Sequence, residues 1–215
     1  MTTFDTLSET EIIGRVLDGE VSLFEIIVRR FNPYLYRVGR SYNFSHDDTE
    51  DLMQDTFVQA YKSLKSFEGR AQFKTWLIRI MLNNCYHKKE KLSYKNEINA
   101  DLNEQATPMF SNSNHQTDKI VQQRELRHII EEALSQIPFD YRVVFSLREV
   151  NGLKVAETAE LLNMSESNVK ARLSRAKAML RKQIEKSYDP GELYEFNLIY
   201  CDRIVKNVME RIKVL

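Results

Sequence analysis

The segment from Lys154 to Lys182 most constrains the fold, because its apolar residues follow two helical stripes separated by one abrupt turn. Asn163 lies between the stripes, and asparagine tolerates the left-handed backbone conformation that a sharp turn requires. We therefore predict a helix-turn-helix, in which Met164 packs the turn and Ser165 or Ser167 caps the second helix. The two stripes are Val155, Ala159 and Leu162, then Val169, Leu173, Ala176 and Leu180.

The second of these helices is strongly basic on its outward side. From Glu166 to Lys186 it carries seven lysines and arginines against two glutamates, a net charge of +5. Such a face can neutralise phosphates while the first turns of the helix reach base edges in a major groove. A solvated helical hairpin can also be basic, but the agreement of turn chemistry and charge favours DNA binding.

Composition indicates an all-helical protein. The 215 residues are 29% charged and 42% apolar, with 6 glycines, 4 prolines and little β-type alternation. The first residues lack the basic start and apolar run of a signal peptide, and no stretch is long enough to cross a bilayer. Cys85 and Cys201 are too few for a disulfide framework, so we expect a cytoplasmic protein. Cys85 and His87 lack a second such pair to complete a metal site.

Capping residues and apolar spacing predict the helices of a first domain, residues 1–95. Ser8 with Glu11 and Ser22 with Glu25 are capping-box patterns, which predict short helices over about 12–17 and 23–31. Pro33 can begin a third helix that reaches about residue 42, and Ser45 precedes a longer one. Two buried stripes follow, one of Met53, Phe57, Ala60, Tyr61 and Leu64, and one of Phe73, Trp76, Leu77, Ile80 and Met81.

The remaining chain predicts a linker and a second domain. Residues 96–118 are polar and aperiodic, which is typical of a flexible linker. In the second domain, residues 119–186, one helix ends at Pro138 and a second spans about 141–150 before the turn at Asn151 and Gly152. Residues 187–215 form an extension whose amphipathic helix we expect to pack on this protein. The predicted fold is all-α, with two small helical domains joined by a flexible linker and a helix-turn-helix in the second.

Two features of the first domain are not required for recognition of duplex DNA. Residues 45–57 hold five carboxylates and no lysine or arginine around Gln54, which suits either surface solubility or docking of a partner. Residues 73–95 combine the only tryptophan with amides, a tyrosine and a basic run, groups that together can hold a strand with unstacked bases. The spacing of Trp76 with Phe73 and Ile80 indicates that Trp76 is mainly core, with at most one edge facing the ligand.

These segments resemble those of the bacterial extracytoplasmic-function (ECF) sigma factors, the two-domain class of RNA polymerase specificity subunits. Residues 50–69 and 73–84 resemble the polymerase-binding and promoter-melting regions of that family, and residues 137–180 resemble its −35 reader. The resemblance covers residues 22–186 apart from the linker, with its motifs in the family's order. The recognition helix begins Ser-Asn-Val-Lys-Ala-Arg where Gly-Thr-Val-Lys-Ser-Arg is commoner, which leaves the promoter preference open.

The resemblance implies three sets of site residues. The residues implied to contact the clamp helices of the polymerase largest subunit are Asp51, Gln54, Asp55 and Phe57. Those implied to bind the melted −10 strand are Trp76, Arg79, Asn83, Asn84, Tyr86, Lys88 and Lys89. Those implied to recognise the −35 duplex are Ser167, Asn168, Lys170, Ala171, Arg172, Arg175, Lys177 and Arg181.

The sequence therefore predicts a sigma factor that binds core RNA polymerase and promoter DNA. The resemblance also implies an anti-sigma factor as a partner. We expect no catalytic residue, metal, cofactor or small-molecule substrate, since the chain has no phosphate-binding glycine loop, paired carboxylates or ligand cluster. The alternative is a helix-turn-helix regulator that binds duplex DNA without melting it.

Overall fold

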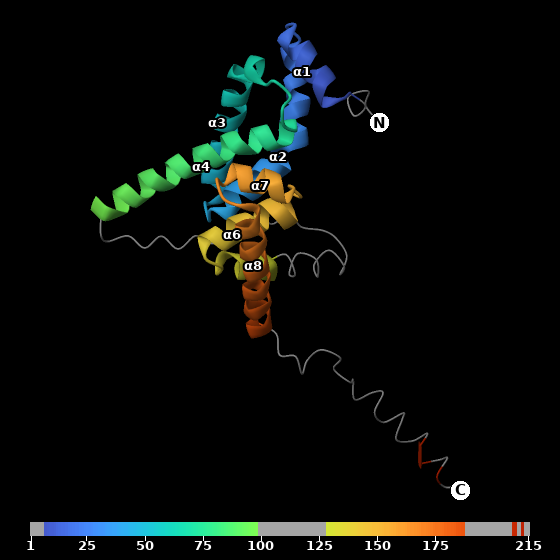
Figure 1. Cartoon of the computed structure of the whole chain (residues 1–215), viewed down its shortest axis with the longest axis vertical. Coiled ribbons are helices and arrows are strands. Elements are labelled where there is room, and N and C mark those ends of the chain that lie inside the picture. Colours follow the sequence, from blue (N-terminus) through green and yellow to red (C-terminus); the bar gives the residue numbers. More distant parts are fainter. Residues whose placement is uncertain (1–6, 99–127, 188–207, 210–211, 213–215) are drawn as a thin grey trace.

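The computed structural model describes residues 7–98, 128–187, 208–209 and 212, and in this part of the chain every regular element is helical. The predicted all-α class is confirmed. Helices α1 to α4 form one group, and helix 128–135 with α6, α7 and α8 forms a second group beside it (Figure 1). Among the described residues, no helix is both long and apolar enough to span a membrane.

Of the two capping boxes predicted at the start of the first group, one forms and the other does not. Helix α1 (Glu9–Leu17) starts at Ser8, whose hydroxyl accepts a hydrogen bond from the Glu11 N–H at 3.2 Å. The predicted cap at Ser22 is wrong, because this residue lies inside a 3₁₀ turn, η1 (Val21–Leu23). Helix α2 (Phe24–Ser41) continues directly from that turn and has no side-chain cap.

Helix α2 also runs through Pro33, so the prediction of a new helix at this residue is wrong. Ile27, Phe31 and Leu35 form one unbroken buried stripe on both sides of the proline. Pro33 itself is exposed, where water can satisfy the carbonyl that loses its intrahelical partner. Burial of the stripe therefore outweighs the missing hydrogen bond.

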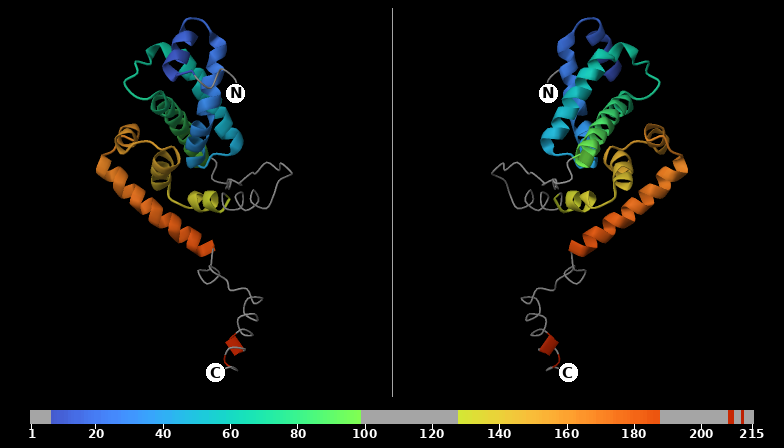
Figure 2. Two further views of the ribbon diagram at one scale, coloured as in Figure 1. Left: turned by 90° about the vertical axis from the view of Figure 1, so that its right-hand side faces the viewer. Right: turned by 90° about the vertical axis from the view of Figure 1, so that its left-hand side faces the viewer.

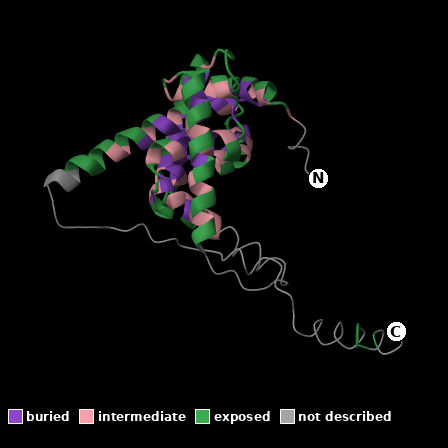
Figure 3. Ribbon diagram, turned by 60° about the horizontal axis from the view of Figure 1, so that its bottom comes forward, coloured by how far each residue is buried: buried purple, intermediate pink, exposed green. Residues whose placement is uncertain are grey.

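Helices α3 (His46–Lys62) and α4 (Phe73–Ile98) complete the first group, joined through the 3₁₀ turn η2 (Leu64–Ser66). Ser45, which the sequence analysis places just before this helix, caps α3 by accepting from the Asp48 N–H at 3.1 Å. The predicted stripe is correct for Phe57, Ala60 and Leu64 but wrong for Tyr61, which is 41% exposed. Residues 86–94 of α4 project from the body and are mainly exposed (Figure 3).

The second group contains the predicted helix-turn-helix. Helix α7 (Val155–Leu161) is followed by Asn163 in the left-handed region, at a φ of 50°, and then by α8 (Glu166–Ser187). Gly152 adopts a φ of 69° at the predicted turn before α7. Helix α6 (Phe139–Phe145) runs into a π-helical turn, η3 (Ser146–Val150), which the sequence analysis does not predict.

The two groups lie against each other (Figure 2). They share one hydrophobic core. Val143, Leu147 and Leu153 of the second group lie in the same buried cluster as the apolar side chains of α1 to α4. The second group also has a small cluster of its own, around Val144, Ala159 and Val169. Most of the predicted linker and extension lies outside the described residues, although Val208 and Ile212 of the extension are described and about half exposed, at 47% and 54%.

Candidate nucleic-acid and protein interfaces

Helix α8 carries the residues predicted to read duplex DNA. Val169 and Ala176 are fully buried and fix which face of α8 points outward. The Ser165 hydroxyl accepts from the Asn168 N–H at 3.3 Å, so Ser165 caps the helix and orients its first turn. Arg172 is partly buried, whereas the other predicted members are exposed: Ser167, Asn168, Lys170, Ala171, Arg175, Lys177 and Arg181.

Two cations of α8 form ion pairs within the second group. Arg172 lies 3.4 Å from Asp140 of α6, and Lys177 lies 3.0 Å from Glu149 of η3. Both pairs are partly exposed, and such pairs contribute only about 0–1 kcal/mol each. A phosphate can therefore replace either carboxylate at little cost.

The residues predicted to capture a single strand lie on two different faces of α4. Asn84 donates to the Thr56 hydroxyl at 3.0 Å, and Lys88 pairs with Asp48, so both side chains face α3. Arg79, Asn83 and Tyr86 are exposed along a face directed toward the second group. The structure thus separates a set that the sequence analysis treats as one.

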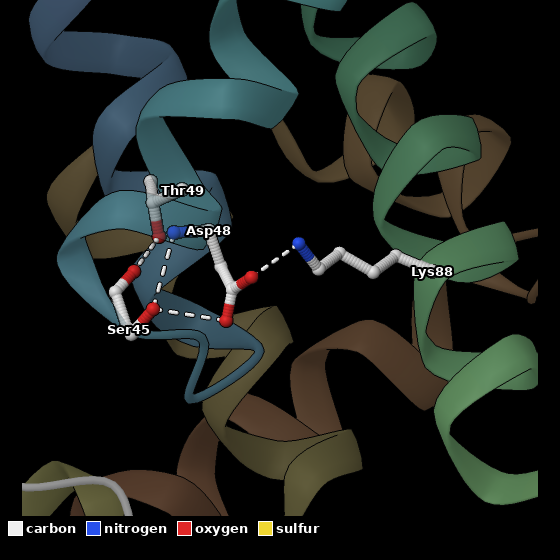
Figure 4. Close-up of polar contacts among 4 residues, drawn as sticks. All are labelled: Ser45, Asp48, Thr49 and Lys88. Carbon is white, nitrogen blue, oxygen red and sulfur yellow. Dashed lines mark hydrogen bonds and ion pairs between the residues drawn. The ribbon is translucent and has the colours of Figure 1, made fainter. Parts of the chain in front are cut away.

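The α3-facing pair of α4 belongs to a network that also caps α3 (Figure 4). The Ser45 hydroxyl donates to one Asp48 oxygen at 2.9 Å, and the Lys88 ammonium donates to the other. Chiefly through the Lys88 contact, this network holds the pKa of Asp48 below its usual range. Lys88 is therefore committed to a structural ion pair in this conformation.

Trp76 and Cys85 have largely structural surroundings. The Trp76 ring lies 5.2 Å from that of Phe67 and 5.3 Å from that of Phe73, and it packs on the core cluster while staying partly exposed, in keeping with the predicted core role. Cys85 is fully buried, and burial raises its pKa to about 12. Among the described residues, no group of three or more potential ligand side chains could hold a metal.

Lys89 is partly buried and contacts the second group. Its ammonium lies 3.2 Å from the centre of the Phe139 ring, at the start of α6. Burial at this position lowers the pKa of Lys89. Phe139 also makes an edge-to-face contact with Tyr42, at a centroid distance of 4.8 Å. Lys89 therefore joins two elements that are far apart in sequence.

The outward face of α3 carries the predicted polymerase contacts, with one exception. Asp51, Gln54 and Asp55 are exposed, whereas Phe57 is only 6% exposed and packs in the core. Phe57 can act only by holding the helix in place. Val58 follows Gln54 and Asp55 by one helical turn and is 54% exposed, so it supplies the apolar group on this face that the sequence analysis missed.

The exposed face of α4 meets the helix-turn-helix across a pocket of about 500 Å³. Asn83 and Tyr86 line it from α4, and Asn168 and Arg172 line it from α8. Beside this pocket, α7 contacts α4 directly through residues that the sequence analysis did not identify, namely Thr75, Glu157 and Glu160. The sequence does contain a signal for this contact. Glu157 and Glu160 are three residues apart, so they lie on the same face of a short helix.

Comparison with known families identifies the class of protein. Residues 27–93 match the family model described as Sigma-70 region 2, and residues 127–180 match Sigma-70, region 4. The chain therefore belongs to the sigma-70 family of RNA polymerase sigma factors, and within it to the ECF group. As a sigma factor it directs promoter-specific transcription initiation. The match to region 2 disfavours the alternative of a regulator that only binds duplex DNA.

Curated relatives support the ECF assignment. The chain is 27% identical over 188 residues to the ECF RNA polymerase sigma-E factor of Haemophilus influenzae, covering 84% of this chain and 97% of that protein. It is also 27% identical over 187 residues to the sigma-E factor of Escherichia coli K12, covering 84% of this chain and 96% of that protein.

Solved structures share the fold. One is CnrH in complex with the cytosolic domain of CnrY, with a TM-score of 0.59 and 24% identity, covering 82% of this chain and 97% of that one. Another is the sigma factor RpoE from Bartonella quintana in complex with the anti-sigma factor NepR, with a TM-score of 0.64 and 23% identity, covering 75% of this chain and 96% of that one.

Proposed function

We propose that this sigma factor divides initiation among three helices of two domains. The outward face of α3 binds core RNA polymerase through Asp51, Gln54 and Asp55, with Val58 as an apolar contact. The exposed face of α4 captures the melted −10 strand through Arg79, Asn83 and Tyr86. Helix α8 reads the −35 duplex. The observation that supports this division is that the three sets lie on separate helices with their members mainly exposed.

We further propose the domain bounds 1–95, 96–118, 119–186 and 187–215 for the polymerase and −10 domain, the linker, the −35 domain and the extension. An anti-sigma factor is a proposed partner, because relatives of similar fold include proteins solved with such inhibitors. The cytoplasm is the proposed location, since both polymerase and promoter are found there. The chain itself is proposed to catalyse no reaction.

The energetics of melting require polymerase to take part. Stacking averages about 1.4 kcal/mol per base-pair step. Aromatic stacking on a captured base returns about 1–3 kcal/mol. Among the proposed strand-capturing residues, the exposed Tyr86 and the partly buried Trp76 therefore offer too little energy to open several pairs. We expect no strand opening by the free chain on duplex DNA.

The test of the proposed function is run-off transcription with purified core polymerase on linear promoters, identified by mapping start sites after overexpression. Wild-type chain is expected to start transcription, and Asp55→Lys is expected to lose most polymerase binding and activity. Glu25→Lys is the matched control, because Glu25 is an exposed carboxylate of α2 with the same charge change. Duplex binding without any start by polymerase would support the regulator alternative instead.

A second test separates base reading from phosphate binding on α8. Arg181→Gln and Lys170→Gln remove one charge each from the same helix. Arg181→Gln is expected to weaken binding similarly on all sequences and to reduce the salt slope by about one. Lys170→Gln is expected to reduce discrimination between cognate and scrambled −35 DNA by about 1–3 kcal/mol. Equal losses on both DNAs would assign Lys170 to the backbone.

A further inference from the structure

A cavity of about 170 Å³ lies where α2 meets helix 128–135 and the segment formed by α6 and η3. Its lining is mainly apolar, with side chains from Tyr36, Leu134, Phe145 and Val150. An engineered apolar cavity of about 150 Å³ binds benzene, so a cavity of this size can hold one aromatic ring. Its described lining residues include no member of the three proposed binding sets.

Three arginines line this cavity, namely Arg37 and Arg40 of α2 and Arg142 of α6. Arg37 and Arg40 each donate to a backbone carbonyl. Among the described residues, none of the three arginines forms an ion pair, although five other arginines do. Glu131, which is exposed, is the one carboxylate among the described lining residues. The lining therefore carries two more positive than negative charges.

Arg142 is the most buried of these cations, with 8% of its surface exposed. Its Nε donates to the Ser41 carbonyl at 2.7 Å, and its Nη1 donates to the carbonyls of Ser135 and Ile137 at 2.8 and 2.9 Å. Ser41 and Ser135 end their helices, so two helix dipoles compensate part of the charge. Burial lowers the pKa of Arg142, yet an arginine stays protonated at neutral pH. Its Nη2 makes no hydrogen bond within the described part of the chain, and Arg37 and Arg40 add two further charges beside it.

We propose that this cavity binds a small carboxylic acid whose apolar body is about the size of one aromatic ring. The apolar walls hold the ring, and the carboxylate pairs with the guanidiniums of Arg37 and Arg40, beside Arg142. A guanidinium suits this anion because its parallel N–H groups match the two oxygens of a planar carboxylate. The inference is independent of the function proposed above, because it uses no residue assigned to polymerase or DNA.

NMR titration of the isotope-labelled full-length chain with three compounds tests the ligand class. Benzoate is expected to bind saturably with a Kd on the order of 1 mM, in line with the affinity of a ligand of this size. Benzamide has the same shape without the charge, and acetate has the charge without the ring. Each is expected to bind about tenfold more weakly than benzoate. Equal affinities for benzoate and benzamide would overturn the proposal, and so would shifts that do not saturate with benzoate.

A pair of charge variants locates the anion. Arg37→Gln with Arg40→Gln is expected to weaken benzoate binding by about fivefold or more and to leave the affinity for benzamide unchanged. Arg15→Gln with Arg29→Gln is the matched control, because it removes two arginines that form exposed ion pairs away from the cavity. An equal loss of benzoate affinity in both double variants would contradict the site, since net charge alone would then explain the binding.

Thermal unfolding supplies an independent measurement, because a ligand that binds the folded chain raises its Tm. Saturating benzoate is expected to raise the Tm of the wild-type chain and of the Arg15→Gln, Arg29→Gln control. The rise is expected to be much smaller in the Arg37→Gln, Arg40→Gln variant. A wild-type Tm that is the same in benzoate and in benzamide at equal concentration and ionic strength would sink the proposal.

Discussion

The two domains differ in where their buried side chains lie. Helices α1 to α4 bury a continuous set of large apolar residues against one another, from Ile12 to Cys85. The helix-turn-helix has a cluster of three buried residues, and Val143, Leu147 and Leu153 of the second domain instead join the core of the first. The first domain is therefore expected to be stable alone, whereas the second gains stability from contact with its neighbour.

The largest expected loss of stability comes from a substitution in the core of the first domain. Leu77→Ala removes a side chain with no exposed surface and should lower the free energy of unfolding by about 2–5 kcal/mol. Urea unfolding followed by the fluorescence of Trp76 measures this, since the only tryptophan packs in the same domain. Val169→Ala should cost about 2 kcal/mol and act on the second domain. A loss below 1 kcal/mol for Leu77→Ala would contradict the comparison.

The next largest loss of stability is expected from a substitution at the contact between the domains. Arg142 donates to carbonyls of Ser41, Ser135 and Ile137, which would lose their charged donor in Arg142→Met. Bonds to charged groups are strong, so we expect a loss of about 3 kcal/mol, measured by chemical unfolding. Arg175→Met, at an exposed position on α8, should change stability by less than about 0.5 kcal/mol. Similar losses for both variants would show that Arg142 does not join the domains.

Some parts of this structure can be predicted from the sequence, and others cannot. Local chemistry is sufficient for the caps at Ser8 and Ser45 and for the left-handed turn at Asn163. It fails at Pro33, where tertiary burial keeps α2 continuous across a residue that ordinarily interrupts a helix. It also cannot find the bond between Arg142 and Ser41, because 101 residues separate the partners and no periodicity links them.

The candidate sites also combine features that local sequence predicts with features that depend on long-range packing. Apolar spacing correctly indicates that Trp76 is mainly core, and the buried Val169 and Ala176 match the predicted stripe of α8. The separation of Asn84 and Lys88 from Arg79 and Asn83 depends on which helices pack on each side of α4. No pattern within α4 carries that information, because the packing partners come from elsewhere in the chain.

A smaller effect tests how tightly the first domain is packed. A Cβ added to Gly39 would lie 2.5 Å from Thr49 Cγ2 and 3.1 Å from Met81 Cε, so Gly39→Ala should cost about 1–3 kcal/mol. Gly14→Ala is the control, since nothing lies within 4 Å and an alanine in the middle of α1 should stabilise by about 0.5–1 kcal/mol. Thermal unfolding of the two variants should shift in opposite directions.

The smallest effect depends on pH. The folded-state pKa of Asp48 is lowered by Lys88, so the pair stabilises the fold above the unfolded pKa of about 3.9. That stability is lost as the pH falls through the folded pKa. Because Asp48 is 43% exposed, solvent screening limits the contribution to about 0–1 kcal/mol. Lys88→Met should thus be less stable than wild type at pH 7, and the difference in unfolding free energy should shrink as the pH falls below about 4 and through the lowered folded-state pKa of Asp48.

The burial of Cys85 determines how this thiol responds to oxidants. Alkylating reagents and peroxides attack the thiolate, and a pKa of about 12 leaves almost none of it at neutral pH. On the buried side of α4 the sulfur is also out of reach of glutathione. Oxidative stress would therefore leave this sulfur unmodified, and a maleimide would label it only in molecules whose first domain has unfolded.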